Sequence, residues 1–284
     1  MPDASQLPFL LQLLEDPSPM VQRAVREELS EFGDDLGHQI ESISDYVRPE
    51  HVAVLRAARL DQRRNQLLTV WPSWFPIEND YIQLETALEL LSTYLRPNTN
   101  IGTLTNGLNL LANEFRAIHT NADSYDLAKF LFETKGFKGS QSKYYSPERS
   151  NLLETMRTHS GNPISLTCIF MLVGYRVGIT VHGCNFPGHF LAMAEVGHEL
   201  VLIDCFNEGR IITPSAFKPD TSTMPIARLE ELLQEPANAE TIVRRILNNL
   251  VNSYTLEGDD SRRNLIQELL DLQRKWMMSP DVVR

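Results

Sequence analysis

The chain lacks the features that would tie it to nucleic acid, to a membrane or to export. Its 284 residues carry a net charge of -11, whereas binding to a phosphate backbone needs a basic surface. No apolar run reaches the ~20 residues of a membrane span. The first residues have no basic segment and place acidic residues inside their apolar part, unlike a signal peptide. We therefore expect a cytoplasmic protein with neither nucleic acid nor a membrane as its partner.

Cysteine is scarce and occurs in an odd number. The chain has three cysteines, Cys168, Cys184 and Cys205. They lack zinc-ligand spacing and do not suit a disulfide framework, so they indicate reduced thiols. His182, His189 and His198 raise the question of a metal, but no Glu or Cys completes a ligand set at close spacing. The sequence predicts neither a metal nor another cofactor.

The most informative stretch of the chain covers residues 161–209. Pro163 stands where a helix should begin, and the apolar run 164–177 is too long for one strand. Three strand-like runs follow, at 180–184, 190–196 and 199–203. His189 opens the second run and Asp204 closes the third. A helix followed by a meander that carries His and then Asp is the layout of a cysteine-nucleophile acyl-transfer site, although no cysteine stands at the helix start.

The rest of the chain reads as helical, because its apolar residues recur at helical spacing. Helices are predicted within 5–44 (two and a possible third), at 50–68, 80–95, 103–118, 123–134, 226–235, 239–254 and 260–277. An aromatic loop at 71–76 is either a binding surface or a packed connection. The predicted parts are an N-terminal helical hairpin at 1–45, helices of the core domain at 46–135, the α-then-β core at 136–225 and C-terminal helices at 226–284.

Residues in the 136–213 region occur in an order and spacing that resemble a known family. They are Gly136, Phe137, Gly139, Tyr144, Tyr145, Asn151, Leu152, Leu153, Gly161, Pro163, Ser165, Leu166, Gly178, Pro187, Gly188, His189, Phe190, Leu191, Ile203, Asp204, Cys205, Phe206 and Gly209. This set resembles the SirB-type transglutaminase-like family. The N-terminal hairpin resembles one HEAT repeat, with a plain amphipathic hairpin as the alternative. The C-terminal hairpin resembles the tetratricopeptide-like tail that often follows this domain.

The resemblance implies a fold and a degenerate site. The fold would be α+β and predominantly helical, with a transglutaminase-like (papain-like) core of one helix packed on a small antiparallel sheet and flanked by helical hairpins. Active relatives carry a cysteine at the first turn of that helix, where the helix N-terminus lowers a thiol's pKa. When Gly161 and Gly178 are aligned with the family's glycines, Pro163 takes the cysteine position. His189 and Asp204 stay in register with the family's catalytic base and carboxylate.

Each candidate residue also has a structural interpretation. His189 and Asp204 are either a remnant catalytic dyad or a buried pair that stabilises the sheet. Cys184 is a candidate displaced nucleophile, but nothing activates it, while Cys168 and Cys205 are expected in the core. Ser165 is expected to form a first-turn hydrogen bond to the backbone.

Three functions are compatible with these residues. We favour a non-catalytic transglutaminase-like domain that binds a protein or peptide, because Pro163 replaces the nucleophile and repeat-like helices flank the core. The alternative is an acyl-transfer enzyme, protease or amidase that uses a displaced thiol with the His189–Asp204 pair. In the third, that pair only stabilises the sheet, and function lies in the helical surfaces.

Overall fold

The chain forms two compact units, residues 1–70 and 71–284. The computed structural model describes residues 4–30, 32, 49–96, 99–140, 146–186, 189–197, 199–212 and 235–279. The boundary between the two units lies after Val70, whereas the sequence suggested domain boundaries after residues 45, 135 and 225. The protein is mostly helical with small sheets, which confirms the predicted α+β class. Within the described ranges, no helix is long and apolar enough to cross a membrane.

The first unit is built from helices with apolar faces. Its elements are η1 (Ala4–Gln6), α1 (Leu7–Leu13), α2 (Pro19–Ser30) and α4 (Pro49–Val70). Its core contains Leu7, Leu11, Leu14, Val25, Leu29, Phe32, Leu55 and Ala58. The turn between α1 and α2 is closed by Asp16, whose carboxylate accepts a hydrogen bond from Ser18 N at 2.8 Å. The predicted helical hairpin is thus confirmed, and the possible third helix before residue 44 lies outside the described residues.

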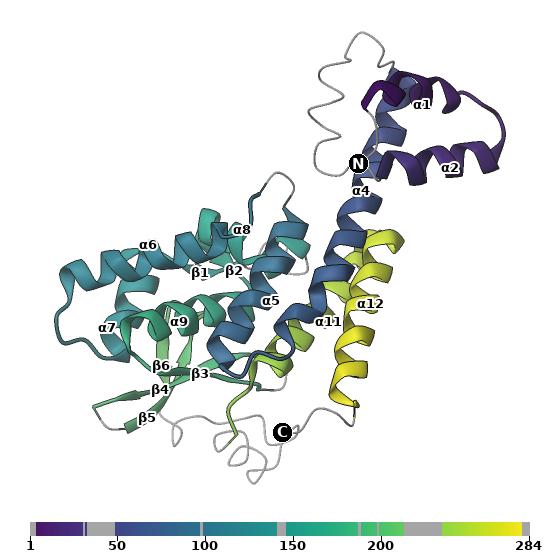
Figure 1. The fold of residues 1–284 in the computed structure, drawn as a ribbon. Helices are drawn as coiled ribbons and strands as arrows, with labels where there is room; N and C mark the ends of the chain where they lie inside the picture. Colours follow the sequence, from purple (N-terminus) through teal and green to yellow (C-terminus); the bar gives the residue numbers. More distant parts are fainter. Residues whose placement is uncertain are drawn as a thin grey trace. The chain divides into compact units, whose positions relative to one another are not determined.

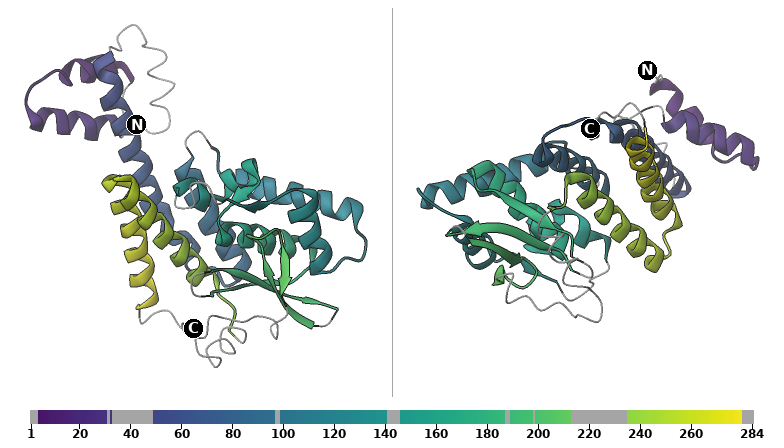
Figure 2. Two further views of the ribbon diagram at one scale, coloured as in Figure 1. Left: turned by 180° about the vertical axis from the view of Figure 1, so that it is seen from behind. Right: turned by 90° about the horizontal axis from the view of Figure 1, so that it is seen from below.

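The second unit contains the other elements, and its main helices match the sequence prediction. The α-helices are α5 (Asp80–Leu95), α6 (Thr103–Ile118), α7 (Ser124–Ala128), α8 (Leu152–Thr158), α9 (Pro163–Val177), α11 (Ala239–Glu257) and α12 (Asp260–Met277). Shorter helical segments are η4 (Trp71–Trp74), the π-helical η5 (Lys129–Thr134) and η6 (Pro147–Ser150). Both views in Figure 2 show α11 and α12 side by side as a pair. The helix predicted at 226–235 falls almost wholly outside the described residues.

The main sheet is an antiparallel meander of four strands. They are β3 (Val181–Cys184), β4 (Leu191–Val196), β5 (Glu199–Asp204) and β6 (Arg210–Ile212), in that spatial order. A separate parallel pair joins β1 (Lys138–Gly139) to β2 (Ser160–Gly161). The first three strands of the meander were predicted, whereas β6, β1 and β2 were not. They are only two or three residues long, which is too short for an alternating pattern to be recognised.

Helix α9 is the buried centre of the second unit. All residues from Pro163 to Gly174 are buried, as expected for a helix that is apolar on every face. It lies between the meander and the helices α5, α6 and α8 (Figure 1). The helix ends at Gly178, whose φ of 78° is the left-handed conformation that glycine adopts most easily. Burying one large apolar side chain stabilises the folded state by about 1.5–3 kcal/mol, so the side chains of α9 together are a main source of stability.

Polar side chains connect the helix ends around α9. Asn79 caps α5 through its side-chain oxygen, and the next residue, Asp80, accepts a hydrogen bond from Ala239 N at the start of α11 at 3.0 Å. The N-cap residue of α6 is Gly102, which has no side chain to cap with. Glu89 of α5 replaces that cap, because its carboxylate accepts from Leu104 N at 3.3 Å and from Thr105 N at 3.0 Å.

The aromatic loop is a packed connection and not a binding surface. It forms η4, in which Trp71 and Trp74 are both fully buried. Phe75 packs against Trp276 of α12, with ring centroids 5.6 Å apart. The sequence left two interpretations open, and the burial of these rings confirms the packed connection. Removing such large apolar rings from water stabilises the fold.

Replacing Glu89 should destabilise the second unit. Glu89→Ala would remove the acceptor of one buried and one partly buried N–H group at the start of α6, and we expect the free energy of unfolding to fall by about 2–4 kcal/mol. Chemical denaturation of the full chain measures this change. Glu133→Ala, at an exposed position, is the control and should change stability by less than about 0.5 kcal/mol. Equal effects of the two substitutions would contradict the capping role.

Candidate functional site

The structure brings His189 and Asp204 together, as the sequence predicted. His189 lies two residues before β4 begins, and Asp204 is the last residue of β5. The Nε2 atom of His189 lies 3.0 Å from Oδ1 of Asp204. An ionised carboxylate only accepts hydrogen bonds, so Nε2 carries a proton in this contact, and Nδ1 holds the lone pair whenever the ring is neutral. The histidine side chain is 30% exposed while that of Asp204 is 9% exposed, so the ring is the accessible member of the pair.

Asp204 is held as a carboxylate by hydrogen bonds to both of its oxygens. Besides His189, Asn207 donates its backbone N–H to Oδ1 at 3.1 Å and its side-chain amide to Oδ2 at 2.7 Å. Burial alone would raise the pKa of Asp204, but the hydrogen bonds from His189 and Asn207 outweigh it and lower that pKa. Asn207 was not predicted from the sequence. Its place three residues after Asp204, in the turn before β6, is the signal that could have identified it.

Arg245 of α11 holds the segment that carries His189. Its guanidinium donates to the backbone oxygens of Phe186 at 3.0 Å and His189 at 3.1 Å, and also to the Asn185 side chain. It lies over the Phe190 ring, 5.3 Å from the ring centroid. Arg245 could not be recognised from the sequence, because it lies 56 residues after His189 and no local pattern links the two.

Strand β1 contacts the turn that follows Asp204. Gly139 donates its N–H to the backbone oxygen of Phe206 at 3.0 Å. A Cβ atom at Gly139 would lie 2.5 Å from that same oxygen, closer than a real Cβ contact. The close approach explains physically why glycine stands at this position of the family-like pattern. The Tyr144–Tyr145 loop and the Pro187–Gly188 pair of that pattern lie outside the described residues.

The first turn of α9 is buried and offers no nucleophile. Pro163 is its first residue and has neither a reactive side chain nor an N–H. The Asn162 side chain caps the helix by accepting from Ser165 N at 2.9 Å and donates to Ser150 Oγ at 3.0 Å. The Ser165 hydroxyl donates to the Arg149 backbone oxygen at 2.8 Å. That hydrogen bond corrects our prediction for Ser165, because its acceptor lies in η6 and not in the first turn of its own helix.

The three thiols are buried, and burial raises the pKa of each. Cys184 ends β3, as predicted, and is 0% exposed. Burial raises its pKa to about 11 even though the Arg245 charge pulls it down. The pKa of Cys205 is raised to about 12, and that of Cys168 is raised further, also through burial. The prediction that Cys168 and Cys205 are core residues is confirmed. A neutral, covered thiol is a poor nucleophile.

No cluster of three metal-ligating side chains occurs among the residues that the structure describes. His182 lies on β3 and His189 before β4, while His198 is outside the described residues. The His189–Asp204 pair has the geometry of a histidine base held by a carboxylate. Nδ1 of His189 can take a proton, and Asp204 orients the ring and stabilises its charged form.

Sequence comparison places this site in a known family. A sequence model of the transglutaminase-like superfamily matches residues 103–248, which include α9, the meander and most of α11. This chain belongs to the transglutaminase-like superfamily. The matched region contains His189, Asp204 and Pro163, and it ends within α11, so α12 lies beyond it.

Individual relatives share part of the chain. A UPF0162 protein of Xylella fastidiosa is 34% identical over 131 residues, which cover 44% of this chain and 47% of that protein. A UPF0162 protein of Vibrio cholerae is 22% identical over 140 residues, or 47% of this chain and 52% of that protein. F-box only protein 21 of Mus musculus is 25% identical over 162 residues, or 54% of this chain and 25% of that protein. The chain thus spans about half the length, or less, of these relatives. No solved structure gave a significant match.

The Asp204 carboxylate should stabilise the fold in a pH-dependent way. A lowered pKa in the folded state means that its contribution is present above the unfolded value, near 3.9, and is lost as pH falls through the folded value. Asp204→Asn should therefore lower the free energy of unfolding by about 1–2 kcal/mol at pH 7. The difference from the unsubstituted chain should shrink below about pH 4. Denaturation of both chains between pH 3 and pH 7 measures this, and a pH-independent difference would contradict it.

Proposed function

We propose that this chain is a non-catalytic member of the transglutaminase-like superfamily that acts as a protein- or peptide-binding module. The observation that carries the proposal is the start of α9, where Pro163 occupies the buried first turn. In the SirB-type resemblance this is the position of the nucleophile. A helix N-terminus activates a thiol through its dipole and free N–H groups, and proline supplies neither a thiol nor an N–H.

The state of the other thiols supports the same proposal. Cys184 ends β3, five residues before His189 in the sequence, and its pKa is raised instead of lowered. His189 and Asp204 would then be a remnant dyad, which stabilises the local structure of the site but catalyses no reaction. The pair's two hydrogen-bonded partners, Asn207 and Arg245, give it a structural role that does not need a nucleophile.

Helical pairs at both ends of the chain support a binding role. In unit 1, α1 and α2 form a hairpin that we propose to be HEAT-like, and in unit 2 α11 and α12 form a pair that we propose to be tetratricopeptide-like. Such helical pairs commonly bind proteins on their surfaces. A matching region also makes up a quarter of F-box only protein 21, so a domain of this kind occurs as one part of a longer chain.

The alternative function is acyl transfer by a displaced thiol. It is favoured by one observation, the intact 3.0 Å contact between His189 and Asp204. Under this alternative Cys184 would have to become exposed and lose its proton to His189. That step works against a thiol pKa of about 11.

The native thiols should resist alkylation. At pH 7 we expect iodoacetamide to leave all three cysteines of the folded chain unmodified over a period in which the denatured chain is fully labelled, because burial keeps them neutral and covered. Peptide-resolved mass spectrometry distinguishes them. Rapid labelling of Cys184 or Cys205 at pH 6 that slows in His189→Ala would favour the acyl-transfer alternative, as would turnover of an ester or amide substrate that His189→Ala abolishes.

Restoring a thiol tests the assignment of Pro163. Pro163→Cys places a thiol in the first turn of α9, where the helix dipole lowers its pKa. This position is buried like those of the native thiols, but only here does a helix N-terminus oppose the effect of burial on the thiol pKa. We therefore expect this thiol to be alkylated faster than the three native ones, and its alkylation to slow when His189→Ala is added. Ile164→Cys is the matched control, because its side chain points about 100° further round the helix. A Pro163→Cys thiol that reacts independently of His189 would show that Pro163 does not occupy the nucleophile position.

A further inference from the structure

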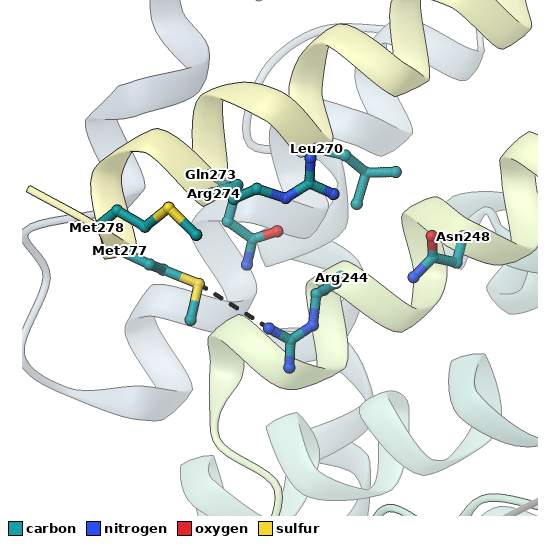
Figure 3. A pocket seen from close by; sticks show the side chains of 7 residues that line it. All are labelled: Arg244, Asn248, Leu270, Gln273, Arg274, Met277 and Met278. Atoms are coloured by element: carbon teal, nitrogen blue, oxygen red, sulfur yellow. Dashed lines mark hydrogen bonds between the residues drawn. The ribbon is translucent and has the colours of Figure 1, made fainter.

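A pocket between α11 and α12 lies apart from the His189 site. It has a volume of about 430 Å³, within the range typical of ligand pockets. Its lining residues are Arg244, Asn248, Leu270, Gln273, Arg274, Met277 and Met278. Figure 3 shows their side chains projecting from the two helices into the space between them. The α12 residues lie outside the region matched by the family model, so the pocket is not a feature of that match.

Two guanidinium groups face this pocket. Arg244 contacts the Thr241 hydroxyl at 3.5 Å and the Met277 sulfur at 4.0 Å, and in the described part of the chain it has no carboxylate partner. Arg274 also lines the pocket and pairs with Asp271 at 3.1 Å, and its side chain is 63% exposed. Each guanidinium has five donors, so both retain donors for a ligand. The planar fork of a guanidinium is suited to bind a carboxylate.

Gln273 supplies an unused acceptor in the same place. Its side chain is 1% exposed, and its amide nitrogen donates to the Glu240 backbone oxygen at 2.8 Å. That partner can only accept, so the amide nitrogen must face it, and Oε1 is left buried without a hydrogen bond. A buried acceptor without a partner costs free energy. A ligand with an N–H group would satisfy it.

Apart from Asn248, the remaining wall is apolar and adaptable. Leu270, Met277 and Met278 contribute it, and Met278 is 76% exposed. Methionine side chains have three rotatable bonds and a polarisable sulfur, so they adjust to ligands of different shape. The wall is therefore suited to an aliphatic side chain that lies beside a charged group.

We propose that this pocket binds a peptide segment in which an acidic residue stands next to an aliphatic one. The carboxylate would contact Arg244 and Arg274, a backbone N–H would donate to Gln273 Oε1, and the aliphatic side chain would pack on the methionines. The proposal rests on the binding role proposed above and gives it a site and a ligand chemistry.

The guanidiniums must act locally, because the chain as a whole is acidic. The net charge of -11 repels an acidic ligand at long range, and Asp271, Glu240 and Glu268 are the nearby acidic residues on the two helices. At physiological salt, charges further apart than about 8 Å are largely screened. Contacts within the pocket then decide the affinity, which makes the site selective for a carboxylate held close to both arginines.

Methionine methyl groups allow the pocket to be observed directly. The full chain has eight methionines, and labelling their ε-methyl carbons with ¹³C gives one NMR signal for each. Met277→Leu and Met278→Leu assign the two pocket signals. We expect titration with an acetylated, amidated Leu-Glu-Leu peptide to shift both. The uncharged Leu-Gln-Leu peptide should bind roughly tenfold more weakly, because it lacks the charge-assisted hydrogen bonds.

Arginine substitutions test the carboxylate contacts. Arg244→Gln should weaken binding of the acidic peptide by roughly tenfold and should leave the melting temperature unchanged, since the two side-chain contacts of Arg244 within the described residues are long, at 3.5 and 4.0 Å. Arg274→Gln should act in the same direction. Arg263→Gln is the matched control, because it removes the same charge from α12 but its guanidinium pairs with Asp260 away from the pocket.

The outcomes separate this proposal from the proposed function. Unshifted Met277 and Met278 signals, equal binding of the two peptides, or equal weakening by Arg244→Gln and Arg263→Gln would overturn the pocket proposal. Shifts confined to the other methionines would do the same while leaving a binding role in place. Cleavage or acyl transfer of the peptide, followed by mass spectrometry, would instead overturn the non-catalytic role.

Discussion

Burial of α9 on every side is the constraint on which the second unit depends. A helix that is apolar all round can exist in water only when other elements cover each face. The meander covers one side, and α5, α6 and α8 cover the other (Figure 1). Its N-terminal donors must be satisfied without water, which Asn162 and the η6 segment accomplish. Asp80 and Glu89 contribute to covering α9, because their carboxylates accept hydrogen bonds at the starts of α11 and α6 and so hold helices of this unit in place.

The His189–Asp204 pair is positioned by segments that are distant in sequence. Asn207 and Gly139 fix the end of β5, and Arg245 fixes the backbone before β4. This bracing does not involve the first turn of α9. If Pro163 stands at the nucleophile position, as we propose, the hydrogen-bonded pair does not depend on a nucleophile, because the contacts that hold His189 and Asp204 also hold the sheet.

Helix α11 contributes residues both to the support of the His189 segment and to the pocket that it forms with α12. Arg245 braces the His189 segment, whereas the preceding residue, Arg244, lines the pocket with α12. Successive residues of a helix point about 100° apart, so neighbouring arginines serve different faces. The pocket depends on Gln273 and the methionines of α12, which lie beyond the region shared with the superfamily. Binding at this place would be a property of the C-terminal helical pair and not of the transglutaminase-like core.

The sequence by itself determined the elements whose signal is local. The sequence predicted helix α9 from its apolar run, with Pro163 at its start and Gly178 at its end. It also predicted the three longer strands and the positions of His189 and Asp204 at strand ends. These signals are local, because periodicity and caps act over a few residues. Tertiary structure decided the rest. The short strands β1, β2 and β6, the acceptor of Ser165, the brace from Arg245 and the unpartnered oxygen of Gln273 depend on contacts between distant segments. Such contacts are set by packing, which leaves no periodic trace in the chain.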